Sequence, residues 1–128
     1  MYKPAIVIGA LFAAIAVITG AFGAHALKAV LSEGQQVVYE TGVRYQFYHS
    51  FALLFAGLVY GFKPAAQIRL ATTFFIIGII LFSGSLYAMT ALQMNGQTGL
   101  DGLGIVTPIG GVFFILGWLF VMIGAIKK

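Results

Sequence analysis

Charged residues are scarce in this chain. Lysine, arginine, aspartate and glutamate make up 8 % of its 128 residues, compared with about 25 % in soluble domains. At 13.6 kDa the chain has room for a single domain. With so little charge, that domain is not a soluble one.

Cysteine is absent, which excludes disulfides, thiolate chemistry and cysteine-ligated metals. Two histidines alone do not supply the three or four protein ligands of a zinc site. The sequence also lacks Walker, Rossmann and nucleophile-elbow patterns. We therefore expect no enzymatic activity, no metal and no resident cofactor.

The chain is basic but does not look like a nucleic-acid binder. Seven basic residues against three acidic ones give a sequence pI near 9.6. These basic residues lie scattered at the ends of apolar segments and form no basic face. We expect no nucleic-acid partner and interpret the charges as determinants of orientation in a membrane.

Long apolar segments fill most of the sequence, which is 61 % hydrophobic with a mean hydropathy of +1.03. A helix of roughly 20 apolar residues crosses a hydrocarbon core of about 30 Å, and only helices and closed barrels satisfy their backbones in lipid. These runs lack the alternation of barrel strands. The sequence predicts an all-α, integral membrane four-helix bundle, a single domain with spans over residues 5–25, 45–62, 70–92 and 105–126.

The first span begins after Lys3 and is followed by an A-x-A sequence at residues 24–26, which imitates a cleavable signal peptide. Its apolar run is longer than the usual hydrophobic region of about 7–15 residues. We therefore expect the segment to be retained as a helix.

Basic residues divide unequally between the two ends of four successive spans. One end carries two basic residues and all three acids, whereas the other carries five basic residues and no acid. The latter are Lys3, Lys63, Arg69, Lys127 and Lys128. The positive-inside rule then places both termini in the cytoplasm of a multi-pass protein of the bacterial inner membrane.

Two local signals predict helix starts. Ser32 and Gln35 have the spacing of a capping box, which predicts a helix over residues 33–62. At 1.5 Å per residue this helix is about 45 Å long, so either its first turns project outward into a polar cap or the helix tilts strongly. Thr107-Pro108 reads as an N-cap followed by proline at the first helical position. The alternative is a proline kink inside a helix that starts at Gly104.

Small residues recur at helical spacing and predict close helix packing, because lipid gives no hydrophobic drive for helix association. They are Gly9, Ala13, Ala16, Gly20, Gly57, Gly61, Gly110, Gly117 and Gly124. We expect the last three glycines to pack against the first helix of the same chain. The surface around Gly57 and Gly61 is then expected to contact another subunit.

Polar residues gather near the predicted outer end of the membrane. They are His25, Glu40, Arg44, Tyr45, Gln46, Tyr48, His49 and Thr107. Polar groups at this depth need partners, and we hypothesise that His49 bonds His25 or a residue within 40–45. Four interpretations stay open: a structural hydrogen-bond network, contact with a lipid or quinone, proton or solute movement, and axial ligation of haem by two histidines.

Four segments together resemble a known family. They are residues 20–27 (GAFGAHAL), 41–53 (TGVRYQFYHSFAL), 81–87 (LFSGSLY) and 107–111 (TPIGG). This combination is similar to the YgdD/YwdK-like family of small bacterial inner-membrane proteins, which share a domain of unknown function and have small transmembrane relatives in animals. The resemblance implies a four-span bundle and implies no activity.

The sequence therefore favours a structural or accessory component of a membrane assembly. We expect its partners to be the lipid bilayer and either further copies of itself or a larger complex. The alternative is a quinone-, lipid- or haem-binding accessory subunit of a respiratory assembly. A small transporter or channel is disfavoured, because residues 70–92 and 105–126 contain no acidic, basic or histidine side chain to line a path.

Overall fold

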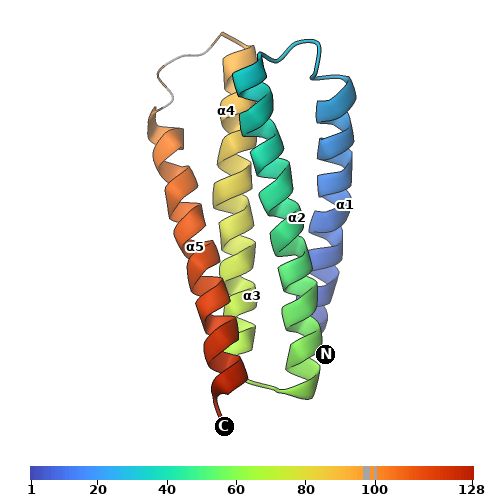
Figure 1. Ribbon diagram of the computed structural model, residues 1–128, viewed down its shortest axis with the longest axis vertical. Helices are drawn as coiled ribbons and strands as arrows, with labels where there is room; N and C mark the ends of the chain where they lie inside the picture. Colours follow the sequence, from blue (N-terminus) through green and yellow to red (C-terminus); the bar gives the residue numbers. More distant parts are fainter. Residues whose placement is uncertain (97–98, 100) are drawn as a thin grey trace.

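A computed structural model of the protein, which describes residues 1–96, 99 and 101–128, consists of helical rods that run up and down beside one another (Figure 1). The elements are α1 (Lys3–His25), α2 (Glu33–Phe62), α3 (Ala66–Gly78), a π-helical turn η1 (Ile79–Ser83), α4 (Gly84–Met94) and α5 (Asp101–Ile126). Because α3, η1 and α4 follow one another without a break, they form one rod, here called the third rod. The predicted all-α fold of four helices is confirmed.

The helices pack mainly against their neighbours in the chain. α1 packs on α2, α2 packs on the third rod, and the third rod packs on α5. In Figure 1, α1 and α5 lie at opposite edges of the molecule, and both termini lie at the same end as the connection between α2 and α3. At that end Lys63 Nζ donates to the carbonyl oxygen of Ala125 at 2.6 Å, which satisfies a free carbonyl near the end of α5.

Three helical segments are long and apolar enough to cross a membrane: Lys3–His25, Ala66–Met94 and Gly102–Ile126. α2 is not among them, although it is the longest helix at 30 residues. Its first half carries the polar residues of the predicted cap together with Tyr45 and Gln46, and His49 lies near its middle. These residues lower its mean hydropathy, so length and composition support three of the four predicted spans.

The predicted start of α2 is confirmed. Ser32 Oγ accepts from the backbone N–H of Gln35 at 3.2 Å, and the Gln35 side chain accepts from the backbone N–H of Ser32 at 3.0 Å. Such a reciprocal pair satisfies two backbone donors that a helix start leaves free. The helix continues to Phe62 as predicted, and residues 26–30 form turns between α1 and α2.

The predicted start of the last helix is wrong. α5 begins at Asp101, so Pro108 lies inside the helix and Thr107 is not its N-cap. Instead, the hydroxyl groups of Thr107 and Ser85 share a hydrogen bond at 2.5 Å across to α4. The proline removes one backbone hydrogen bond from the interior of α5. Membrane helices tolerate this where neighbouring hydroxyl groups satisfy nearby polar groups.

The connection predicted over residues 93–103 falls partly outside the described residues. Within the described part, Gly96 and Gly99 have φ angles of 78° and 72°. Residues other than glycine rarely adopt this left-handed backbone conformation, so glycine is strongly favoured at both positions.

The glycines of α5 pack against the third rod, and not against α1 as the sequence suggested. A Cβ added at Gly110 would meet the backbone of Phe82, and one at Gly117 would meet the ring of Phe75. One at Gly124 would meet Ile68. The regular spacing identified a close helix contact, but the spacing carried no information about which helix lies opposite.

The surface around Gly57 and Gly61, which the sequence suggested for a subunit contact, faces the start of the same chain. A Cβ at Gly57 would meet Ile6 and Ala5 of α1, and one at Gly61 would meet Met1. Farther along the same interface, a Cβ at Gly9 would lie 3.0 Å from the carbonyl oxygen of Ser50. These glycines therefore let α1 and α2 of the same chain approach closely.

The hydrophobic core lies where α1, α2, the third rod and α5 converge. Its fully buried side chains include Leu53 of α2 and Phe75 of α3, which contact buried residues of the neighbouring helices. Ile79 of η1 and Phe114 of α5 belong to the same cluster. The core thus lies against polar and aromatic groups of α2, among them His49.

Candidate functional site: a polar and aromatic layer across α2

Gln46 links three helices. Its side chain is 3 % exposed. Gln46 Nε2 donates to the carbonyl oxygen of Phe12 in α1 at 2.8 Å, and Tyr87 Oη of α4 donates to Gln46 Oε1 at 2.7 Å. Each of these two bonds connects different helices, and each joins polar groups that would be costly to leave unpaired in lipid.

Further hydroxyl groups strengthen the same contacts. Ser83 Oγ of η1 donates to the carbonyl oxygen of Gly42 at 2.6 Å. Tyr39 Oη donates to the carbonyl oxygen of Thr19 at 2.5 Å, which joins α2 to α1. Ser83 lies in the π-helical turn, a distortion that often accompanies functional sites. Here the turn holds a buried hydroxyl group against the backbone of α2.

The polar and aromatic layer across α2 consists of the hydrogen bonds around Gln46 and the aromatic rings around His49. The His49 side chain is 4 % exposed. Its Nδ1 lies 2.8 Å from the carbonyl oxygen of Tyr45, and Trp118 Nε1 of α5 donates to its Nε2 at 3.1 Å. A carbonyl oxygen only accepts and an indole N–H only donates. The two partners therefore fix a neutral imidazole with its proton on Nδ1.

Aromatic rings surround this histidine. The Phe114 ring is stacked on the imidazole with ring centroids 3.5 Å apart and planes 9° from parallel. Tyr45 lies against Phe82 at 4.7 Å between centroids. A groove of about 560 Å³ opens beside these rings, lined by Tyr45, Tyr48, His49, Phe82, Gly111, Phe114, Ile115 and Trp118. Its aromatic lining suits a flat apolar ring.

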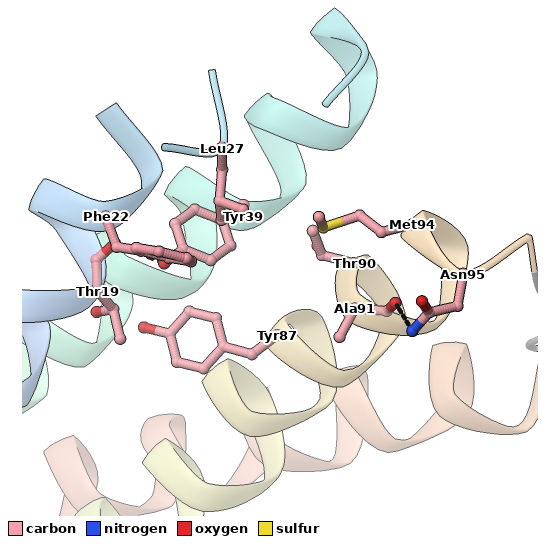
Figure 2. Close-up of a pocket in the computed structure, with 9 residues that line it drawn as sticks. All are labelled: Thr19, Phe22, Leu27, Tyr39, Tyr87, Thr90, Ala91, Met94 and Asn95. Atoms are coloured by element: carbon pink, nitrogen blue, oxygen red, sulfur yellow. Dashed lines mark hydrogen bonds between the residues drawn. The ribbon is translucent and has the colours of Figure 1, made fainter. Parts of the chain in front are cut away.

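A second pocket lies between α1, α2 and α4, near the end of the molecule away from the termini. Figure 2 shows Tyr39 and Tyr87 side by side, with Tyr87 pointing toward Thr19. The pocket measures about 420 Å³ and is lined by Thr19, Phe22, Leu27, Tyr39, Tyr87, Thr90, Ala91, Met94 and Asn95. The hydroxyl groups of Tyr39, Tyr87 and Thr90 are bonded to other residues. The remaining lining is mostly apolar and suits a hydrocarbon chain.

Comparison with known proteins places the chain in a family. The family described as "Protein of unknown function (DUF423)" matches residues 19–111. The chain belongs to the DUF423 family. The resemblance noted in the sequence is therefore confirmed. No solved structure matches this DUF423 chain.

Curated relatives of this DUF423 chain match it along nearly its whole length. A UPF0382 membrane protein of Staphylococcus epidermidis is 42 % identical over 125 residues, which cover 98 % of this chain and 97 % of the relative. A UPF0382 membrane protein of Staphylococcus aureus is 43 % identical over 122 residues, covering 95 % and 94 %. The UPF0382 membrane protein YwdK of Bacillus subtilis is 37 % identical over 126 residues, covering 98 % of each chain. This DUF423 chain is therefore a bacterial membrane protein with several candidate spans.

The structure brings together only part of the predicted polar cluster. Tyr45, Gln46 and His49 meet in the layer, and Tyr45 is the partner of His49 that the hypothesis allowed. His25 is exposed at the end of α1, whereas both ring nitrogens of His49 are bonded to Tyr45 and Trp118. The paired-histidine arrangement considered for haem is therefore not formed in this DUF423 protein.

The other predicted residues lie apart from His49. Glu40 and Arg44 are exposed at a separate groove between α1 and α2. Thr107 bonds Ser85, and Tyr48 is exposed at the rim of the aromatic groove.

Sequence reasoning missed Phe114 and Trp118, which supply the stacking ring and the hydrogen bond of His49. One signal was available, because both residues lie close in sequence to Gly117. A glycine that allows close helix approach also brings its neighbours to the interface. In this DUF423 protein those neighbours reach α2, because α2 and α5 both pack on the third rod.

Proposed function

We propose that the protein is a four-span accessory component of the bacterial inner membrane, with a structural rather than catalytic role. The observation that carries this proposal is the use of the buried polar side chains as links between helices. Gln46, His49 and Ser83 each bond a group on another helix. Such bonds hold a small bundle in one arrangement. A component that presents a fixed surface to its partners requires this rigidity.

The burial of polar groups in α2 also supports its role as the fourth span. Gln46, His49 and Ser50 are buried and bonded. After Ser50, the large side chains that α2 exposes are apolar, among them Phe51 and Phe55. A helix of this kind fits a membrane despite its lower hydropathy, because its polar atoms are satisfied within the protein.

The proposed topology has four crossings with cytoplasmic termini, and its motive is the excess of basic residues at the end that holds the termini. Since the chain lacks cysteine, single cysteines can report accessibility in intact cells. Lys28→Cys and Asn95→Cys should react with an impermeant thiol reagent, whereas Ala66→Cys and Lys127→Cys should react only after lysis. Equal labelling of Lys28→Cys and Ala66→Cys would exclude a crossing by α2, and a reversed pattern would invert the orientation.

The outer face of α1 is the surface best suited to another membrane helix. Ala10, Ala14 and Ala21 are exposed and lie on one side of α1, with spacings of four and seven residues, and the exposed Val17 lies on the same side. α1 packs mainly on α2, so this small-residue face is not covered within the chain. Small residues allow the close backbone approach that drives helix association in lipid. We propose that this face seats the protein on a second copy or on a larger assembly.

Native mass spectrometry in mild detergent tests this role. The wild-type protein should appear above its monomer mass, and the double variant Ala10→Leu, Ala14→Leu should appear mainly as a folded monomer. Ala125→Leu, which changes an exposed alanine of α5, should leave the assembly intact. A monomeric wild-type protein, or an assembly unaffected by both sets of changes, would contradict the proposal.

A second candidate function is favoured by the groove beside His49, whose Tyr45, Phe114 and Trp118 walls suit a quinone ring. A lipid-soluble ring carrier would then sit against an accessory subunit of a respiratory assembly. The same mass spectra discriminate the two functions, since a retained quinone adds a defined mass to the monomer as well as to any assembly.

A further inference from the structure

A groove of about 310 Å³ lies between α1 and α2, separate from the aromatic groove and from the pocket of Figure 2. We call it the headgroup groove, and its lining includes Gly20, Gln36, Glu40, Val43, Arg44 and Phe47. The polar network through Gln46 does not use any of these side chains.

Gln36 presents an unpaired acceptor in this region. Its Nε2 donates to the carbonyl oxygen of Gly23 and to Glu40 Oε1, both at 3.2 Å. Both partners are acceptors, so the amide must turn its NH₂ group toward them. This leaves Gln36 Oε1 buried without a partner among the described residues. A buried acceptor in this state is rare and favours a ligand that brings a donor.

Glu40 and Arg44 add opposite charges one helical turn apart. Both side chains are exposed, and within the described part of the chain no ion pair joins them. A carboxylate only accepts hydrogen bonds, and a guanidinium only donates them. Together with Gln36 Oε1, the groove therefore has two acceptors for a cation and a fork-shaped donor for a phosphate.

The order of these groups along α2 matches the order of groups in a phospholipid. α2 runs from the end with the predicted polar cap toward the end with the termini (Figure 1). Along this direction the groove presents Gln36 and Glu40, then Arg44, then Phe47. At 1.5 Å per residue, Arg44 lies about 6 Å deeper than Glu40, and Phe47 about 4.5 Å deeper again. An amine-bearing phospholipid likewise carries its ammonium outermost, its phosphate next and its acyl chains deepest.

The groove also lies at the depth where headgroups are found. α1 has 23 residues, so it is about 35 Å long and spans roughly one bilayer core. Gly20 belongs to its final turns, beside Val43 of α2. Since a Cβ at Gly20 would lie 3.3 Å from Val43 Cγ1, glycine keeps the two helices close at the base of the groove.

We infer that the headgroup groove binds a phospholipid with a primary amine, such as phosphatidylethanolamine. Arg44 takes the phosphate, Glu40 and Gln36 Oε1 take the ammonium group, and an acyl chain lies over Phe47. This inference rests on the membrane placement proposed above, but it does not depend on the proposed assembly through α1.

Native mass spectrometry with added lipid tests the inference. The protein in detergent is titrated with phosphatidylethanolamine, phosphatidylcholine and phosphatidylglycerol of matched acyl chains. We expect about tenfold greater retention of phosphatidylethanolamine, a difference of about 1.4 kcal/mol, because the quaternary amine of phosphatidylcholine lacks N–H donors and phosphatidylglycerol lacks a cation. Glu40→Gln and Gln36→Leu should each abolish this preference, and Arg44→Gln should reduce retention of all three lipids.

Two variants control for general charge effects. Glu33→Gln removes an exposed carboxylate from the first turn of α2, and Arg69→Gln removes an exposed cation at the opposite end. Both should retain the preference. Equal retention of the three lipids, or a preference that survives Glu40→Gln, would overturn the inference. Displacement of bound lipid by inorganic phosphate alone would also overturn it, since it would indicate a simple anion site. The protein's oligomeric mass is read separately, so failure of lipid binding is distinguishable from failure of assembly.

Discussion

Gly110→Ala is expected to destabilise the packing of α5 on the third rod, whereas Gly111→Ala should have little effect. A Cβ at Gly110 would lie 2.8 Å from Cα of Phe82, a contact with backbone that cannot move aside. At Gly111 the nearest contact is Phe82 Cδ2 at 3.9 Å, an ordinary van der Waals distance. Overpacking of this kind costs about 1–3 kcal/mol.

The two variants form a matched pair. Each replaces a glycine within α5 by alanine, so each gains the same intrinsic helix preference of about 1 kcal/mol. The difference between them therefore isolates the contact with Phe82. Thermal unfolding in detergent, followed by circular dichroism, should show a lower midpoint for Gly110→Ala than for Gly111→Ala. Identical midpoints would show that α5 does not approach the third rod as closely as described.

His49→Ala is expected to give the other large effect. It removes a buried ring that is stacked on Phe114 and leaves the Trp118 indole N–H without its partner. Truncating a large buried ring in a soluble protein costs about 3–5 kcal/mol, whereas single hydrogen bonds between membrane helices average about 0.6 kcal/mol. We therefore expect a clear fall in thermal stability that comes mainly from lost packing, and Trp118→Phe should cost much less than His49→Ala.

The chain contains a single tryptophan, so its fluorescence reports directly on Trp118. His49→Ala should shift the emission, because the indole loses its hydrogen bond to the imidazole. His25→Ala is the matched control, since His25 is exposed at the end of α1, and it should change neither stability nor emission. An unchanged spectrum for His49→Ala would argue against the His49–Trp118 contact.

Features that depend on a few neighbouring residues were predictable from the sequence. The capping box of Ser32 and Gln35 involves residues three apart, and it correctly set the start of α2. The helical segments followed from apolar runs, because lipid leaves the backbone few alternatives. Tyr45, Gln46 and His49 were among the eight polar residues that the sequence grouped, and helical spacing places these three near one another on α2.

Features that depend on tertiary placement were not predictable. His49 and Trp118 are 69 residues apart, and no local pattern links them. The glycine repeat of α5 indicated a close helix contact but not which helix makes it. Thr107-Pro108 resembled a helix start because threonine followed by proline is the usual pattern there. In the structure the Thr107 hydroxyl does not cap a helix but shares a hydrogen bond with Ser85 of α4.

The π-helical turn η1 has a consequence for how the length of this chain can vary. A π turn holds an additional residue within a continuous helix, so a one-residue deletion within Ile79–Ser83 would leave an ordinary α-helix from Ala66 onward. That deletion would turn α4 relative to α3 only slightly, because a π turn with the additional residue and an α turn without it cover nearly the same angle. Tyr87 would then still face Gln46, and Ser85 would still face Thr107. A one-residue deletion within α3 or α4 would instead turn the two halves by about 100°, so η1 is the place where the third rod tolerates a change of length.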